Sequence, residues 1–370
     1  MISSQQIIQM IEELAPKTLA LDWDNPGLAI GDYSKKISKI LLTLTVTPEA
    51  INHAIDNGFE MLISHHPMFF KPIKSIRADL PQGKMIYQAV KNDLIIYSAH
   101  TNLDIAFGGV NDALADVLGL KDTRVLTKTH QEKLNKVVVF VPKSHEEAVR
   151  NAMGSAGAGF IGNYSHCSFS LNGKGTFKPL AGTKPYIGET DKLEMVDEVR
   201  IETIAQESIT KKVVNAMIKA HPYEEVAYDI YPLENEGQIY GLGRVGKLDK
   251  PMTLKDFCQF VKQKLDAKFL KVTGKMDKTV SKVALCGGAA GDLIENAAFC
   301  GADVYLTGDV KYHQAEDARV LDIAVIDAGH FYTENLVMPY LKQYLDGRIK
   351  QAKQDAEIQI YTGKDPFIFV

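Results

Sequence analysis

Three apolar runs of this chain each end in side chains that could bind a metal ion. The side chains are His65 and His66 after residues 61–64, His100 after residues 94–99, and His330 and Glu334 after residues 323–328. Short apolar runs of this kind are typical of buried strands, and open α/β sheets build their sites where the carboxyl ends of such strands meet. Nitrogen and carboxylate ligands without thiolate suit zinc, manganese, iron, cobalt or nickel. The pattern therefore predicts a metal centre.

The spacing of these residues favours more than one ion. His330 and Glu334 share one face if the chain from Phe331 onward is helical. His65 and His66 would point apart on a regular strand, but at a strand end each imidazole can face a different ion. Asp104, which follows His100 in the same segment, adds a carboxylate. Such a set can hold two ions about 3.5–4 Å apart with positions open to water. Each piece alone is weaker, because a His-x-x-x-Glu spacing is common by chance and an isolated histidine is more often hydrogen-bonded than a ligand.

The elements that must position these side chains alternate between strand-like and helical patterns. We expect an amphipathic helix over residues 1–14, strands at 40–45, 61–64 and 94–99, helices at 48–57 and 84–92, and further strands at 282–286, 303–306 and 323–326. This alternation predicts an α/β domain with a mostly parallel sheet and helices on its faces.

The middle of the chain follows a different pattern. Two β-α-β-like halves are expected there, with strands at 136–141, 165–172, 175–179, 198–205 and 226–232 and helices at 145–157 and 208–220. Two such halves suggest an inserted α+β ferredoxin-like domain. The predicted organisation is a first segment at 1–126, an insertion at 127–246 and a second segment at 247–370, with linkers around 121–136 and 241–250. The outer segments should form one domain, because neither alone supplies enough ligands for a closed site.

Composition limits the class of protein. A chain of 370 residues with 45% apolar and 24% charged residues is globular and long enough for roughly two domains. No apolar run approaches the roughly 20 residues that span a bilayer, and the first residues lack a signal-type pattern, so we expect a cytoplasmic protein. The four cysteines form no CxxC pair, which argues against thiolate zinc and disulfide frameworks. A net charge of −4 counts against nucleic acid as a partner without excluding it.

Several motifs together resemble those of the GTP cyclohydrolase I type 2 family, also called the NIF-three-like proteins. The matching segments are His65-His66-Pro67-Met68-Phe69-Phe70, Ala99-His100-Thr101-Asn102-Leu103-Asp104, Gly329-His330-Phe331-Tyr332-Thr333-Glu334, Trp23-Asp24-Asn25-Pro26-Gly27-Leu28, Thr307-Gly308-Asp309-Val310-Lys311-Tyr312-His313 and His221-Pro222-Tyr223-Glu224-Glu225. They are spread over nearly the whole chain.

The resemblance implies a NIF-three-like α/β domain that carries two divalent ions per subunit and is interrupted by a PII/CutA-like insertion. Zinc is the metal expected in a purified sample, with iron, manganese, cobalt and nickel as alternatives. The implied ligands are His65, His66, Asp104, His330 and Glu334, with Glu334 able to bridge both ions. His100 is implied to orient Asp104 or a bound water. The implied assembly is a toroidal homohexamer, a dimer of trimers. Family members often carry Asp at the position of Thr45, a difference that bears on activity more than on metal binding.

The activity implied by the resemblance is opening of the guanine imidazole ring of GTP by metal-activated water, with formate release and with His100 or His313 as proton shuttle. The glycine-rich segment Cys286–Asp292 could present amides to an anion, and Lys311 could contact a phosphate. Two alternatives remain open. One is a metal-dependent phosphoester hydrolase or amidohydrolase acting on another small molecule, and the other is a non-enzymatic metal-binding or regulatory hexamer.

Overall fold

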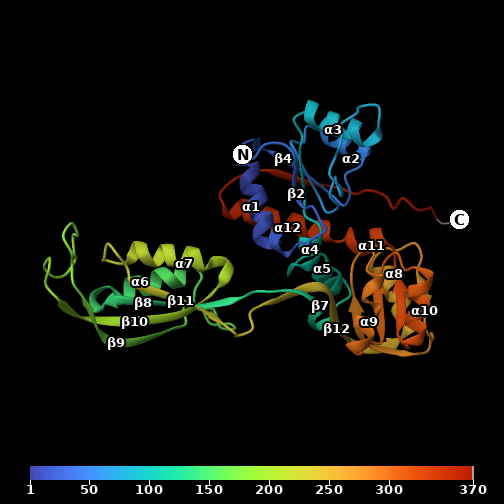
Figure 1. The fold of residues 1–370 in the computed structure, drawn as a ribbon. Coiled ribbons are helices and arrows are strands. Elements are labelled where there is room, and N and C mark those ends of the chain that lie inside the picture. The colour runs from blue at the N-terminus through green and yellow to red at the C-terminus, as the bar shows by residue number, and fades with distance from the viewer. Residues whose placement is uncertain (369–370) are drawn as a thin grey trace. The chain divides into compact units, whose positions relative to one another are not determined.

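The computed structural model describes residues 1–368, which form two compact units. Among the described residues, unit 1 comprises 1–130 and 240–368, and unit 2 comprises 131–239. Figure 1 shows the elements of both units along the chain. No helix between residues 1 and 368 combines the length and the apolar character that crossing a membrane requires.

The first part of unit 1 is built around a five-stranded sheet in the order β17-β4-β5-β6-β2. Neighbouring strands from β17 to β6 run parallel, and β2 is antiparallel to β6. The elements of this part are β1 (Ile2–Ser3), α1 (Ser4–Leu14), η1 (Lys17–Leu19), β2 (Gly27–Ile30), β3 (Lys36–Ile37), β4 (Lys39–Thr43), α2 (Pro48–Asp56), β5 (Met61–Ser64), α3 (Pro81–Lys91), β6 (Ile95–Ser98), α4 (Thr101–Ile105), α5 (Val110–Val117), α12 (Val337–Gln351) and β17 (Glu357–Tyr361).

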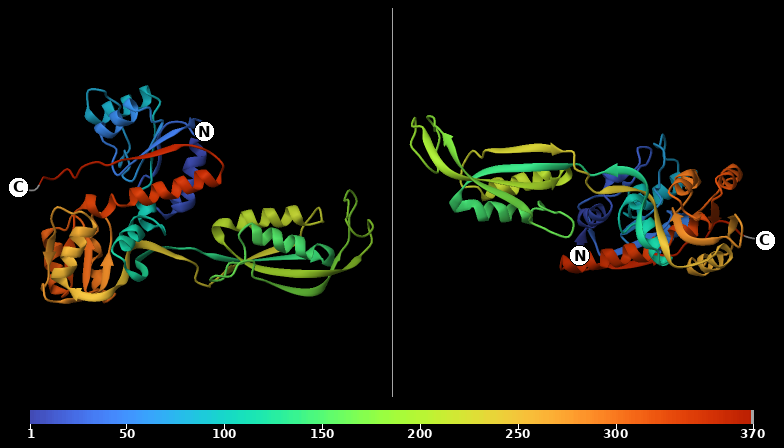
Figure 2. Two further views of the ribbon diagram at one scale, coloured as in Figure 1. Left: turned by 180° about the vertical axis from the view of Figure 1, so that it is seen from behind. Right: turned by 90° about the horizontal axis from the view of Figure 1, so that it is seen from below.

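Alternating apolar side chains bury both faces of this sheet. Ile40, Leu42 and Ile63 pack in a cluster with residues of α1, α5 and α12, which cover one face. Leu41 and Leu62 pack with residues of α2 and α3 on the other face. Figure 2 lets the reader follow α1 and α12 side by side against the sheet. Because helices cover both faces of the sheet, β4 and β5 are apolar along most of their length.

Local sequence fixes the helix starts. Ser3 accepts a hydrogen bond from the amide of Gln6, whose side chain accepts one in return from the amide of Ser3, which is a capping box. Thr47 caps α2 in front of Pro48, which lacks the amide hydrogen that a first helical turn leaves unpaired. The predicted helices at 1–14, 48–57 and 84–92 are thus confirmed to within a few residues.

The second part of unit 1 has its own six-stranded sheet in the order β13-β16-β15-β14-β12-β7. Strands β14, β15 and β16 run parallel, while β12 and β13 are antiparallel to their neighbours β14 and β16. Its elements are β7 (Lys121–Gln131), β12 (Ile239–Thr253), α8 (Leu254–Lys264), β13 (Lys271–Thr273), β14 (Thr279–Leu285), η3 (Gly291–Leu293), α9 (Ile294–Phe299), β15 (Val304–Thr307), α10 (Tyr312–Val320), β16 (Ala324–Asp327) and α11 (His330–Glu334). The α/β class is confirmed, but unit 1 contains two large sheets, and a two-stranded pair of β1 and β3, where one sheet was expected.

Unit 2 is a four-stranded antiparallel sheet with two helices. Its elements are β8 (Leu134–Pro142), η2 (Lys143–His145), α6 (Glu146–Ser155), β9 (Ser168–Phe177), β10 (Glu194–Gln206), α7 (Glu207–Ala220) and β11 (Tyr228–Leu233). The sheet order is β11-β8-β10-β9. Residues of α6 and α7 share one apolar cluster with Val139 of β8 and Ile201 of β10, so both helices cover the same face.

Two predictions about irregular segments were wrong. The glycine- and lysine-containing stretches at 121–136 and 241–250, expected to be linkers, lie mostly in the long strands β7, β8 and β12. The two strands expected at 165–172 and 175–179 form the single strand β9. Glycine and lysine weaken a strand prediction, but pairing with β10 over the whole of β9 supplies backbone hydrogen bonds that outweigh that preference.

Candidate metal centre

Three strand ends of unit 1 bring the predicted ligands together. His65 and His66 follow β5, His100 precedes α4 and Asp104 lies within it after β6, and α11 begins at His330 after β16. Three groups have ligand atoms that all lie within 4.8 Å of one another, namely His65 with His66 and His100, His66 with His330 and Glu334, and His65 with Asp104 and Glu334. The five predicted ligands and His100 thus form one cluster.

Glu334 is the residue that the last two groups share. Its Oε2 lies 2.9 Å from His66 Nε2 and 2.9 Å from His330 Nε2, while its Oε1 lies 3.8 Å from His65 Nε2. The side chain is buried, and the helical spacing from His330 holds both residues on one face of α11. Each carboxylate oxygen therefore faces a different set of nitrogen atoms.

Two polar atoms in the cluster have no hydrogen-bond partner although both are buried. They are His65 Nε2 and Asp104 Oδ1, which lie 3.5 Å apart. His65 Nδ1 lies 2.9 Å from the carbonyl oxygen of Ala99, which can only accept, so Nδ1 carries the hydrogen. In the neutral ring, Nε2 then carries a lone pair. Unpaired buried polar atoms are costly, and a cation between this nitrogen and the carboxylate would satisfy both. The donor set therefore fits a metal ion.

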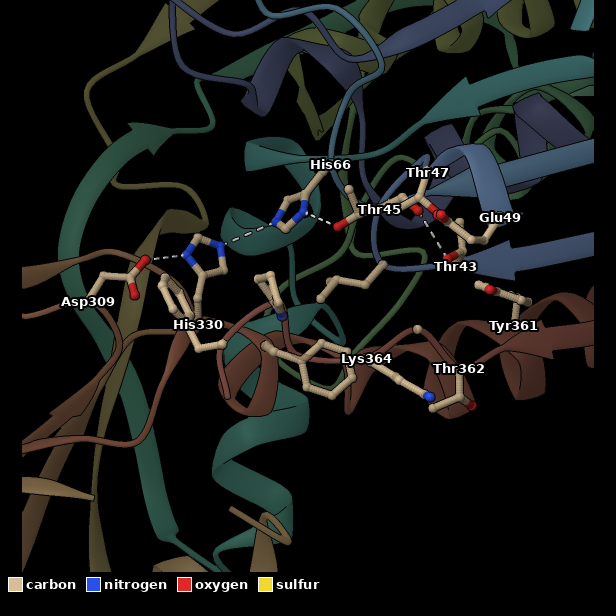
Figure 3. Close-up of a pocket in the computed structure, with 15 residues that line it drawn as sticks. Thr43, Thr45, Thr47, Glu49, His66, Asp309, His330, Tyr361, Thr362 and Lys364 are labelled. Atoms are coloured by element: carbon tan, nitrogen blue, oxygen red, sulfur yellow. Dashed lines mark hydrogen bonds and ion pairs between the residues drawn. The ribbon is translucent and has the colours of Figure 1, made fainter. Parts of the chain in front are cut away.

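The other imidazoles of the cluster are held in the same way. His330 Nδ1 lies 2.8 Å from Asp309 Oδ2, and His100 Nδ1 lies 2.8 Å from Asp24 Oδ1. Histidines that bind metals usually donate their second ring N–H to an oxygen, which fixes the ring and its tautomer. Figure 3 shows how this pairing turns His330 and His66 toward each other.

Thr45, where the family resemblance predicts Asp, contacts one of the predicted ligands. Its hydroxyl oxygen lies 2.7 Å from His66 Nδ1 (Figure 3). A neutral hydroxyl therefore orients His66 where a carboxylate would otherwise do so. The substitution keeps a hydrogen-bond partner for the ring and removes one negative charge from the site.

Sequence reasoning gave no role to Asp24 or Asp309. Both lie inside motifs that carried the family resemblance, but only the fold shows that each pairs with a histidine. Asp24 also accepts hydrogen bonds from the amide and the hydroxyl of Thr101. His100 was expected to orient Asp104 or a bound water. Its Nδ1 pairs with Asp24 rather than with Asp104, and the alternative of a bound water stays a prediction.

The charges of the cluster attract a cation. Burial alone would lower the pKa of His65, but Asp104 and Glu334 outweigh burial and raise it to about 9. Burial raises the pKa of Asp104 to about 6, against the attraction of His65. Burial also opposes the charged form of Glu334, yet hydrogen bonds with His330 and His66 and the nearby His65 hold its pKa well below the usual range. Without metal, protons on imidazoles supply the positive charge that the carboxylates require.

Three amides of the glycine-rich loop after β14, which could have faced an anion, are already paired within the protein. The amides of Gly287, Gly288 and Ala290 donate to the side chains of Asn111, Thr333 and Thr307. Instead, the loop makes room for the cluster, because a Cβ on Gly288, whose φ is +68°, would overlap Glu334 Oε1. These contacts favour the alternative of a tight turn, in which Gly288 permits the close approach of Glu334.

Two other predicted residues lie outside the cluster. His313 is exposed near the start of α10, where its ring contacts Tyr312. Lys311 is also exposed. Neither lines the cavity described next, so the structure does not bring them to the metal centre.

A cavity of about 640 Å³ opens beside the cluster (Figure 3). It is lined by His66, His330 and Asp309 on one side and by residues around β4 and β17 on the other. Among the described lining residues, Lys364 is the one lysine, and Glu49 and Asp309 are the acids. The volume is typical of pockets for small molecules.

Comparison with known proteins agrees with this geometry. The sequence model of the family described as Duf34/NIF3 (NGG1p interacting factor 3) matches residues 2–366. The chain belongs to the Duf34/NIF3 family. A curated relative from Bacillus subtilis (strain 168), named GTP cyclohydrolase 1 type 2 homolog, is 47% identical over 370 residues, which cover 100% of this chain and 99% of the relative.

Solved structures of similar proteins share the fold of this Duf34/NIF3 chain. A Bacillus cereus protein related to NIF3 is 47% identical with a TM-score of 0.95, and the match covers 100% of this chain and 99% of that one. A Staphylococcus aureus protein is 29% identical with a TM-score of 0.79, again over 100% and 99% of the two chains. The family resemblance predicted from motifs is confirmed.

Proposed function

We propose that this Duf34/NIF3 protein is a dinuclear-metal-dependent hydrolase acting on a small molecule. The observation that carries the proposal is the position of Glu334, whose two carboxylate oxygens face different groups of histidine nitrogens beside an open cavity. Two divalent ions held there would lower the pKa of bound water toward about 7 and polarise the bond to be broken.

The residues of the cluster would have three roles, namely metal binding, orientation of the imidazoles and proton transfer. His65, Asp104 and Glu334 form one ligand group, and His66, His330 and Glu334 form the other. Asp309 and Thr45 hold the imidazoles of the second group in place. His100, held by Asp24, is the residue placed to move a proton, because it lies within the cluster without belonging to either of these two ligand groups.

GTP is the first substrate to test. The names of the curated relatives refer to GTP cyclohydrolase, and the corresponding reaction would open the guanine imidazole ring and release formate. The cavity favours a second candidate, hydrolysis of another small molecule, because Lys364 is the one lysine among its described lining residues and a triphosphate carries several negative charges. A phosphoester or amide substrate of lower charge would need fewer cations.

Formate release distinguishes these candidates. Purified protein reloaded separately with zinc, manganese and iron would be incubated with GTP, with Glu334→Ala as the inactive variant and Thr279→Val, exposed and outside the cavity, as the matched control. Formate that requires metal and Glu334 supports the GTP reaction. No formate from protein that holds two ions per subunit would refute it and leave the other hydrolase. Failure to retain any divalent ion would refute the metal-dependent hydrolase itself.

The assembly and the role of unit 2 are further parts of the proposal. We expect a cytoplasmic toroidal homohexamer, a dimer of trimers, in which unit 2 is a ferredoxin-like, PII/CutA-like insertion. The β-α-β-β-α-β order of unit 2 and its sheet order β11-β8-β10-β9 support that fold assignment. Sedimentation equilibrium of the full chain would test the hexamer, and a monomer or dimer at working concentrations would contradict it.

A further inference from the structure

Unit 2 contains a cavity of its own that the metal-site chemistry does not use. Its volume is about 460 Å³, and all the residues that line it lie between Phe140 and Ala227. The walls come from the end of β9, from the segment between β9 and β10, and from the motif His221-Pro222-Tyr223-Glu224-Glu225. The strands and the connecting segment can be followed beyond α6 and α7 in Figure 1. Part of that motif, Tyr223 to Glu225, therefore lines a cavity.

A buried histidine shapes the motif. His221 Nε2 lies 2.9 Å from the carbonyl oxygen of Phe140, so this nitrogen carries the hydrogen. Nδ1 is then free to accept a hydrogen bond from the amide of Tyr223 at 3.1 Å. On the far side, the amide of Lys184 donates to Glu224 Oε1 at 2.9 Å. These contacts hold Tyr223 and Glu224 against the cavity and tie the connecting segment to them.

Three aromatic rings, in contact through that of Tyr223, form part of the apolar wall. The ring centroids of Phe177 and Tyr223 are 5.8 Å apart with an interplanar angle of 60°, and those of Tyr186 and Tyr223 are 6.2 Å apart at 48°. Rings inclined in this way present their faces from different directions. A planar base stacks best on a ring parallel to it, whereas an ammonium group is attracted to each ring face separately. The ring geometry favours a compact cationic group over a flat base.

Carboxylates complete the wall. Glu198 Oε1 accepts a hydrogen bond from the hydroxyl of Tyr223 at 3.1 Å. A Cβ on Gly175 would overlap Glu198 Oε2, so the glycine leaves space for this carboxylate. Glu224 and Glu225 also line the cavity.

Two lysines line the cavity as well, but one of them is paired with an acid outside it. Lys178 lies 3.5 Å from Asp191, which does not line the cavity, and Lys174 is exposed. Three carboxylates therefore face the cavity against one lysine without such a pairing, and the local charge attracts a cation.

From these observations we infer that the cavity of unit 2 binds an organic cation with an alkylammonium group. The Phe177, Tyr186 and Tyr223 rings surround the ammonium group, and Glu198 neutralises its charge. Quaternary ammonium compounds and linear polyamines share this chemistry. The site lies wholly within unit 2, so it is independent of the hydrolase proposal.

Calorimetric titration of the full-length protein tests the inference. Choline probes a quaternary ammonium, spermidine probes a polyamine, and 3,3-dimethyl-1-butanol is the neutral counterpart of choline with the same shape. Adenosine probes a flat base. We expect saturable binding of choline or spermidine at millimolar or lower concentration, weakened by added salt, and none of the neutral alcohol. Binding of choline alone would indicate a quaternary ammonium ligand, and binding of spermidine alone would indicate a polyamine.

Variants locate the binding. Tyr186 is 53% exposed, so Tyr186→Ala removes one wall without opening a core, and it should weaken binding roughly three- to thirtyfold. Glu198→Gln should weaken it similarly, while Tyr223→Phe keeps the ring and should retain binding. Tyr164→Ala and Glu147→Gln, both exposed and outside the cavity, are the matched controls.

Three results would overturn the inference. They are binding of adenosine or of the neutral alcohol in place of the cations, cation binding that Tyr186→Ala leaves unchanged, and no binding of either cation. Retained metal content in each variant shows that unit 1 is unaffected and keeps this test separate from the hydrolase proposal.

Discussion

Among the described residues, the hydroxyl of Thr45 is the only side-chain partner of His66 Nδ1. Replacing it therefore tests whether Thr45 orients His66 within the ligand group formed with His330 and Glu334. Thr45→Val keeps the shape of the side chain and removes the oxygen. Thr45 is exposed, which means that the change opens no cavity in the core. We expect Thr45→Val to weaken metal binding by the His66, His330 and Glu334 group and to leave the His65, Asp104 and Glu334 group intact.

The size of the effect follows from the contacts. A neutral hydrogen bond contributes about 1 kcal/mol net, which corresponds to roughly fivefold in affinity. The same bond also fixes the ring so that Nε2 faces Glu334 Oε2 at 2.9 Å. Loss of partners that orient metal-binding histidines typically costs roughly tenfold to hundredfold. We therefore expect a loss of between about fivefold and hundredfold for the ion next to His66. Thr45→Asp should act in the opposite direction, because a carboxylate forms a stronger, charge-assisted bond.

Competition between the protein and a chromogenic zinc chelator measures this effect. Wild-type protein should show two binding steps per subunit, and Thr45→Val should weaken one of them. Thr362→Val is the matched control, since Thr362 lines the same cavity without contacting a ligand. If Thr45→Val binds both ions as the wild type does, or weakens both steps equally, then Thr45 does not orient His66 and the division into two ligand groups is wrong.

Three other predictions test the geometry around the cluster. Glu334→Gln should lose both ions together because Glu334 belongs to both groups, whereas Asp104→Asn should lose only one, and equal metal content in the two variants would contradict this. Gly288→Ala should displace Glu334 and lower the metal content. Gly347→Ala should leave the metal content unchanged, because a Cβ there meets nothing within 4 Å. Equal losses of metal in the two variants would refute the role given to Gly288. Arg244 is 1% exposed and donates to Asp112 and to the carbonyl oxygens of Gly241, Gly243 and Ala106. Arg244→Met should therefore lower the free energy of unfolding by about 3–5 kcal/mol. Arg348→Met, which breaks an exposed pair with Glu13, should lower it by less than about 1 kcal/mol, and similar urea midpoints for the two would contradict the difference.

Four of the predicted ligands were recognisable because they follow apolar strands. His65 and His66 follow β5, and His330 and Glu334 follow β16, and the sequence marks both strands by apolar residues and a sharp change of composition. The two strands belong to different sheets, so the sequence predicted the strand ends but not how the two sheets pack to bring them together. The helical spacing of His330 and Glu334 then fixed their common face.

The partners of the histidines were not predictable in the same way. Asp24 lies 76 residues from His100, and Asp309 lies 21 residues from His330, in turns whose course depends on tertiary packing. An aspartate in a turn is common for local reasons, such as hydrogen bonds to nearby amides. The role of the glycines in the loop after β14 was not predictable either. Glycine is required both where a loop binds an anion and where another chain segment approaches closely, and the sequence alone does not distinguish the two.

The pairing of distant segments has a consequence for metal binding itself. Glu334 is separated from His66 by 268 residues, and neither the first nor the second part of unit 1 contains a complete ligand group with Glu334. The cluster can form only after both parts have packed, so metal ions would bind the folded unit and not the separate segments. Such binding would add its free energy to folding. His65 Nε2 and Asp104 Oδ1 are buried without a hydrogen-bond partner, and a bound ion would remove the cost of that burial.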